Sequence, residues 1–198
     1  MAAPKSKDTS DLSGSWHLNR ELSEDPDKIF ALQAVPWVVR KVLKYANLSL
    51  HITQTITSDG ATGEISESNG ATFTDKKPVT ILQMKQTVHP GGFNSEGTYP
   101  VNGEAQDVSL PIFGDVNMML QFVDVADIEN ESLRQKLSET GLPKTVISET
   151  AYNAAKGWHA RVIWGFEYVK GAKYLTRNIK TWNDKENLVS RMVYDYKS

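Results

Sequence analysis

The chain has 198 residues, which is enough for one domain with a sizeable core. Its 22 lysines and arginines nearly balance 24 aspartates and glutamates, so there is no basic footprint for nucleic acid. It has no cysteines, which excludes disulfides, thiol catalysis and cysteine-based metal sites. The N-terminus lacks the apolar stretch of a secretory signal, and no apolar run approaches the ~20 residues that span a bilayer. We therefore predict a soluble, cytoplasmic protein without a membrane span.

The N-terminal part predicts one strand followed by a pair of helices. Residues 1–11 are polar and are expected to form a flexible tail, with 12–198 as a single domain. Residues 12–20 alternate and form the first predicted strand, with Trp16 on its apolar face. A helix start follows at 23–26, and 36–46 (PWVVRKVLKYA) carries apolar residues at helical spacing.

The middle of the chain predicts further strands. Gln54 is a polar residue on the apolar face of the strand at 47–57, where it either satisfies backbone groups or contacts a ligand. Residues 89–103 are expected to be irregular, and 130–140 a short surface helix. The other predicted strands are 61–68, 79–89, 114–125, 145–153 and 187–196.

The clearest pattern is a hairpin near the C-terminus. Every second residue is non-polar in the series Trp158, Ala160, Val162, Trp164, Phe166 and Tyr168. Lys170 and Gly171 suit a two-residue turn, which sets Trp164 opposite Arg177 on the apolar face. An arginine there needs an acid, a stacked ring or a bound anion, and we favour stacking on Trp164 over a ligand contact. A loop with an odd number of residues would instead put Arg177 in solvent.

The loop length of the last predicted hairpin sets which residues of the final strand lie on the same face of the sheet as Arg177. An even loop, such as 183–186, turns Leu188, Ser190, Met192, Tyr194 and Tyr196 inward. An odd loop turns Val189, Arg191, Val193 and Asp195 inward instead. We favour the even loop because its inward set is more apolar.

The strand count and order predict the fold class. About nine or ten short strands follow one another in meander order, with one helix pair after the first. This pattern is typical of an all-β protein, a closed antiparallel up-and-down β-barrel with a helix–turn–helix lid. A barrel of this size can enclose one small ligand.

Several segments resemble those of a known superfamily. Gly14-Ser15-Trp16 resembles the Gly-x-Trp signature of the calycins, the lipocalins and fatty-acid-binding proteins, and the helix pair after this strand is the fatty-acid-binding-protein arrangement. More specifically, the chain resembles fungal lipocalin-like barrels in DLSGSWHLNRELSEDPD, WVVRKV, LHITQ, GW followed by IWGFE, and RMVYDY. The resemblance implies a cavity for a lipophilic molecule. Some such barrels in fungal secondary metabolism are cofactor-free cyclases or isomerases.

The chain departs from the fatty-acid-binding pattern on its last strand. That family reads a carboxylate with an Arg-x-Tyr pair, whereas Arg191 and Tyr194 here are three residues apart and fall on opposite faces of a regular strand. In calycins a late basic residue often packs over the first-strand tryptophan. The resemblance therefore implies that Arg177 or Arg191 covers Trp16.

The sequence carries no signature of metal or cofactor chemistry. The four histidines lie on separate segments without ligand spacing. The chain has neither a Gly-x-Ser-x-Gly elbow nor a Gly-rich phosphate loop that opens a helix, so no cofactor is predicted.

Two hypotheses remain, a carrier of a hydrophobic ligand and a cofactor-free enzyme. For the enzyme, Arg177, Gln54 and Tyr194 would donate hydrogen bonds to a carbonyl that gains negative charge. We expect Arg177→Leu to weaken binding or turnover while leaving the fold intact. The predicted cavity wall consists of Trp16, Trp37, Leu50, Met84, Met118, Phe122, Trp158, Trp164, Phe166, Tyr168, Leu175 and Met192.

Overall fold

The computed structural model describes residues 1–57, 78–139 and 144–197, and contains ten strands and three α-helices within them. The strand predicted at 61–68 lies outside the described residues. None of the described helices is long and apolar enough to cross a membrane. The elements are β1 (Gly14–Leu18), α1 (Asp27–Leu32), α2 (Trp37–Tyr45), β2 (Asn47–Thr57), β3 (Val79–His89), β4 (Ser95–Pro100), β5 (Ala105–Leu110), β6 (Gly114–Asp124), a 3₁₀ turn (Val125–Asp127), α3 (Glu131–Ser138), β7 (Thr145–Asn153), β8 (Trp158–Val169), β9 (Ala172–Trp182) and β10 (Asn187–Lys197).

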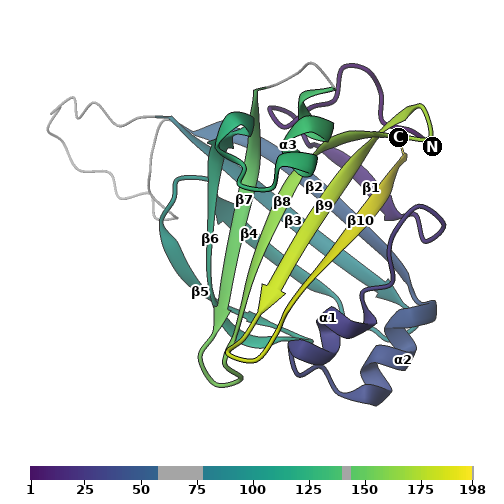
Figure 1. Ribbon diagram of the computed structural model, residues 1–198, viewed down its shortest axis with the longest axis vertical. Coiled ribbons are helices and arrows are strands. Elements are labelled where there is room, and N and C mark those ends of the chain that lie inside the picture. Colours follow the sequence, from purple (N-terminus) through teal and green to yellow (C-terminus); the bar gives the residue numbers. More distant parts are fainter. Residues whose placement is uncertain (58–77, 140–143, 198) are drawn as a thin grey trace, which may run out of the picture.

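All ten strands belong to one antiparallel sheet that curls into a nearly closed barrel (Figure 1). Its strands run in the order β4-β3-β2-β1-β10-β9-β8-β7-β6-β5, so β1 pairs with both β2 and β10. The connection from β4 to β5 lies beside β6, because Val101 forms a bridge with Leu120 and the Gly103 N–H donates to the Leu120 carbonyl at 2.9 Å. The predicted all-β meander barrel is confirmed.

The helix pair covers one end of the barrel, as predicted from its place after the first strand (Figure 1). Both helices use their apolar residues to pack on the barrel rim. Ile29 of α1 joins the main core, while Val35, Leu43 and Ala46 form a smaller cluster with Val88 of β3. The α1–α2 pair is therefore the lid of the barrel.

Both predicted hairpin registers are confirmed. The two-residue turn at Lys170 and Gly171 places Trp164 opposite Arg177. The even loop at 183–186 then places Met192 opposite Arg177 and Tyr194 opposite Leu175. The middle of β8, β9 and β10 therefore points its predicted side chains into the barrel.

Two strands were not predicted, and the expectation that 89–103 is irregular is wrong. β4 lies within that range and β5 follows it directly. Within β4 only Tyr99 is buried, and β5 has no buried residue. Short edge strands of this kind carry little of the apolar alternation that reveals a strand in sequence.

Residues 1–11 are not a loose tail but lie across the barrel end opposite the lid (Figure 1). The Ala3 N–H donates to the Lys173 carbonyl at 2.7 Å, and the Tyr196 N–H donates to the Met1 carbonyl at 2.8 Å. Thr9 is 1% exposed, and its hydroxyl donates to the Thr145 carbonyl at 2.7 Å. The N-terminal segment therefore plugs this end of the barrel.

Gln54 holds the plug rather than a ligand. Its Oε1 accepts from the Leu12 N–H at 2.9 Å, while its Nε2 donates to the carbonyls of Ser10 at 2.9 Å and Thr9 at 3.3 Å. Of the two roles left open by the sequence, the structure has the one in which the amide satisfies backbone groups. This corrects the assignment of Gln54 as a catalytic donor.

Gln54→Leu is expected to lower the free energy of unfolding by about 1–3 kcal/mol, because it leaves part-buried backbone groups unpaired. Amide hydrogen exchange of residues 9–12 should rise while that of β8 and β9 is unchanged. Gln83→Leu, on the exposed side of the neighbouring strand, is the matched control. Equal amide hydrogen exchange at residues 9–12 in both variants would show that Gln54 does not hold the N-terminal segment in place.

Candidate functional site

A cavity of about 160 Å³ lies inside the barrel beneath the lid. Ile29 and Phe30 of α1 form its roof together with Leu43 of α2. Most of the remaining wall is apolar and comes from the barrel strands, with the β5–β6 turn closing one side through Phe113. The cavity can therefore hold an apolar molecule.

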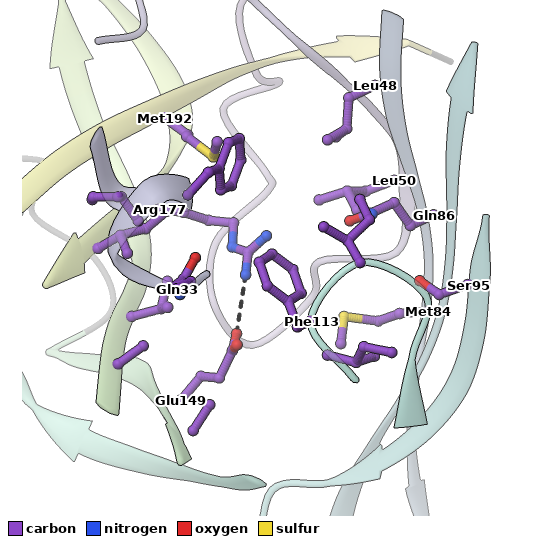
Figure 2. A pocket seen from close by; sticks show the side chains of 18 of the residues that line it. Gln33, Leu48, Leu50, Met84, Gln86, Ser95, Phe113, Glu149, Arg177 and Met192 are labelled. Atoms are coloured by element: carbon purple, nitrogen blue, oxygen red, sulfur yellow. Dashed lines mark hydrogen bonds and ion pairs between the residues drawn. The ribbon is translucent and has the colours of Figure 1, made fainter. Parts of the chain in front are cut away.

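Eight of the predicted site residues line this cavity. Figure 2 shows Leu50 and Met84 on one side of the space, with Arg177 and Met192 reaching in from another. The cavity-lining members of the predicted set are Leu50, Met84, Met118, Trp158, Trp164, Arg177, Met192 and Tyr194.

Six other predicted wall residues lie elsewhere. Trp16, Phe166 and Leu175 are buried but fill the core outside the cavity, where the Trp16 ring lies 5.9 Å from that of Phe166. Trp37, Tyr168 and Phe122 are instead partly or largely exposed, at 62%, 51% and 36%. Trp37 begins α2 on its solvent side, and Tyr168 lies at the outer end of β8. Alternation identifies the face of a strand but not how far the interior extends along it.

Arg177 is held by both an acid and a ring. Its guanidinium carbon lies 4.1 Å from the centroid of the Trp164 ring, and its Nη2 lies 3.2 Å from Oε2 of Glu149 (Figure 2). The Trp164 indole N–H donates to the same carboxylate oxygen at 2.7 Å. The predicted stacking is therefore present, together with the acidic partner named as an alternative.

Glu149 was missing from the predicted site. It lies on β7 between two inward residues, Ile147 and Ala151, and pairs across the sheet with Val162 of β8. Assigning faces to the predicted strand at 145–153 would have revealed a carboxylate on the apolar side.

The charges at this cluster balance, and its tyrosines are neutral. Burial alone would lower the pKa of Arg177. The charge of Glu149 and, after it, the interaction with Tyr194 raise this pKa above its ordinary value. Burial raises the pKa of Tyr194 despite the opposing charge of Arg177. Burial and then the charge of Glu149 raise the pKa of Tyr99. The cavity thus contains one ion pair and phenols that keep their protons at neutral pH.

Several donors on residues that line this cavity have no strong acceptor. Arg177 Nε and Trp158 Nε1 are buried and have no hydrogen-bond partner among the described residues. The Tyr194 hydroxyl interacts with the Arg177 side chain, and it donates only to the sulfur of Met192, a weak acceptor at 3.5 Å. Among the described residues no cluster of three His, Asp or Glu side chains is suited to a metal ion. The arrangement is suited to donating hydrogen bonds to an oxygen of a bound molecule.

Arg177 and Arg191 do not lie where the resemblance to calycins implied. Arg191 and Tyr194 do lie on opposite faces of β10: Tyr194 lines the cavity, whereas Arg191 pairs with Glu167 at 3.3 Å. The expectation that Arg177 or Arg191 covers Trp16 is wrong. Arg177 lies over Trp164 instead, and the ring of Tyr196 packs against Trp16 at 4.9 Å.

Comparison with known proteins identifies one curated relative, and no protein-family model matches the chain. The relative is "Probable pericyclase scpY" of Mollisia scopiformis, 27% identical over 197 residues, which cover 98% of this chain and 94% of the relative.

Solved structures of fatty-acid-binding proteins share the fold. That of Schistosoma mansoni, in complex with arachidonic acid, matches with a TM-score of 0.53 at 14% identity over 96% of this chain and 98% of its own. Fatty-acid-binding protein 1 of Echinococcus granulosus matches with 0.51 at 15% identity, over 94% and 98%. The fluorescent protein UnaG matches with 0.53 at 11% identity, over 94% and 97%. The chain therefore has the β-barrel fold of the fatty-acid-binding proteins.

Proposed function

We propose that the protein binds a neutral lipophilic metabolite in its barrel cavity and, without a cofactor, catalyses its cyclisation or isomerisation. The observation that carries this proposal is the Glu149–Arg177–Trp164 cluster, with Tyr194 beside it, in an otherwise apolar cavity. The similarity to a protein named as a pericyclase, along almost the whole chain, supports this reaction class.

The apolar wall supplies binding and shape. Each ~100 Å² of apolar surface removed from water contributes about 2.5 kcal/mol, so the wall alone can retain a hydrophobic molecule. A flexible substrate confined beneath the lid is held with its reacting carbons close together. The free molecule must lose conformational entropy to reach this shape, whereas the bound molecule has already lost it on binding.

The donors supply electrostatic stabilisation. In a pericyclic closure electrons move around a ring of atoms, no proton is gained or lost, and the product is an isomer of the substrate. Hydrogen bonds from Arg177 Nε and the Tyr194 hydroxyl to a substrate carbonyl would draw electron density toward that oxygen as the new bonds form. Glu149 would hold the guanidinium in place through its hydrogen bond with Nη2, which leaves Nε unpaired among the described residues.

The alternative is a carrier that leaves its ligand unchanged. It is favoured by the fold and by the presence of an arginine and a tyrosine in the cavity, which could hold a carboxylate. Glu149 argues against an anionic ligand, since its pairing with Arg177 leaves no net positive charge to neutralise one. The cytoplasmic location stays a prediction under either function.

The test is to incubate the purified protein with a lipophilic extract of its source organism and follow the extract by liquid chromatography and mass spectrometry. We expect one compound to decrease while an isomer of equal exact mass appears, faster than with heat-denatured protein. The double variant Glu149→Leu/Arg177→Met should slow this at least ~100-fold, because it removes the charged donor. Gln83→Leu, outside the cavity, should convert the compound at the wild-type rate.

Two other outcomes would contradict the proposed enzymatic activity. A compound that copurifies in native mass spectrometry and is recovered unchanged would make the protein a carrier. If no compound is retained or converted, the cavity has neither role.

A further inference from the structure

The indole N–H of Trp158 lacks a partner that the other buried tryptophans have. Trp16, Trp158 and Trp164 are all fully buried. Trp16 Nε1 donates to the Leu12 carbonyl at 2.8 Å, and Trp164 Nε1 donates to Glu149. Trp158 Nε1 has no partner among the described residues, although Trp158 lines the cavity. Native proteins rarely leave a buried donor unpaired, so this group calls for an acceptor.

The surroundings of Trp158 are aromatic and firmly held. The ring of Phe113 lies 6.1 Å away in an edge-on arrangement, and Phe30 of the lid lies 6.2 Å from Phe113. The carbonyl of Phe113 accepts hydrogen bonds from the side chains of Asn153 and Lys156, each at 3.0 Å, which fixes the β5–β6 turn against the β7–β8 turn. The N–H therefore lies in a rigid, apolar part of the wall, where a hydrogen bond to a ligand is shielded from water.

Trp158 and Arg177 lie at different depths of the same cavity. Trp158 is six residues before Trp164, the ring under Arg177, which separates their α-carbons by roughly 20 Å along β8. Both side chains line the cavity. A ligand that extends from the cluster toward the lid can therefore contact both side chains.

We propose that Trp158 Nε1 is a second hydrogen-bond donor to the ligand, at the opposite end from Arg177. This rests on the proposed function, because it assumes the same cavity ligand. An indole N–H can only donate, so the ligand atom there is an acceptor, such as a carbonyl or ether oxygen. The ligand class is therefore a neutral lipophilic molecule with two separated acceptor oxygens. Trp158 is a positioning residue that fixes which way round the molecule lies.

A buried water is the competing explanation. Thr181 pairs with Ala160, on the same face of the sheet as Trp158 and one step further along β8. Its hydroxyl is also buried and unpaired among the described residues. A water between the indole N–H and this hydroxyl would satisfy both groups.

The test uses protein labelled with ¹⁵N-tryptophan and two neutral probes of equal chain length, dodecane-2,11-dione and 2-dodecanone. The chain has five tryptophans, and Trp158→Phe identifies the Trp158 indole signal by its absence while keeping an aromatic ring beside Phe113. We expect the diketone to shift this signal downfield and to leave the signal of the exposed Trp37 unchanged. Wild-type protein should bind the diketone about 5-fold more tightly than the monoketone, and Trp158→Phe should bind both equally.

Four results would overturn the proposal. An indole signal that is already downfield without probe and moves only in Thr181→Val would assign the partner to water. A diketone preference retained in Trp158→Phe would place the second donor elsewhere. If Glu149→Leu/Arg177→Met weakens binding of both probes while the Trp158 signal never moves, this inference fails and the cavity proposal stands. If neither probe binds the wild type, both fail together.

Discussion

Glu149→Leu is expected to lower the free energy of unfolding by about 3–5 kcal/mol, whereas the double variant Glu149→Leu/Arg177→Met should recover most of that loss. The Arg177 side chain is 16% exposed, and its pKa is raised above the ordinary arginine value, so it is charged at neutral pH. Without Glu149 a cation would remain buried with no anion to balance it. Replacing both partners by apolar side chains removes the uncompensated charge together with the ion pair.

Arg177→Leu alone is expected to be destabilising as well. It would leave Glu149, 11% exposed, with only the hydrogen bond from Trp164. This replaces the expectation from sequence that Arg177→Leu leaves the fold intact, since that expectation did not include a buried carboxylate. Trp164→Phe should cost less, about 1.5–3 kcal/mol, because it removes one hydrogen bond to a charged group and keeps the ion pair.

Urea unfolding of the four proteins in the Glu149–Arg177 cycle gives the coupling directly. A surface pair provides the control: Lys85 and Glu96 lie 3.5 Å apart with side chains 59% and 73% exposed, and Glu96→Leu should change stability by less than about 1 kcal/mol. Additive losses across the Glu149–Arg177 cycle would show that the two residues do not act as a pair.

The position of Arg177 could be predicted because it depends only on local pattern. A two-residue turn fixes the β8–β9 register, and an apolar alternation fixes which face is inside. Glu149 lies 28 residues before Arg177 and meets it only across β8, so no local pattern joins them. Face assignment on the strand at 145–153 would have placed it inside, but the pairing itself is a property of the closed barrel.

The depth of the cavity could not be predicted from the strands. Trp164 and Phe166 are neighbours on one face of β8, yet only Trp164 lines the cavity. Phe166 packs against Trp16 at the plugged end. What fills that end includes the N-terminal segment, held by Gln54 across 42 residues of sequence. Sequence alternation contains no information on such long-range packing.

Gly14→Ala is expected to lower the free energy of unfolding by about 2–4 kcal/mol, for two separate reasons. Gly14 has φ of +139°, a conformation that L side chains rarely adopt. A β-carbon there would also lie 2.6 Å from Cε2 of Tyr196, whose ring packs on Trp16. The Gly-x-Trp signature is thus explained physically, because the glycine makes room for the ring that covers the tryptophan.

Two variants separate the two reasons, with thermal and urea unfolding as the measurements. Gly92 also has a positive φ, +66°, but nothing lies within 4 Å of its β-carbon position, so Gly92→Ala should cost only the backbone strain, about 1 kcal/mol. Adding Gly14→Ala to a Tyr196→Ala background should likewise cost less than in the wild type, because the clash is gone. If Gly14→Ala is no more harmful than Gly92→Ala, the contact with Tyr196 is not what requires glycine. The signature would then serve the backbone conformation of β1 alone.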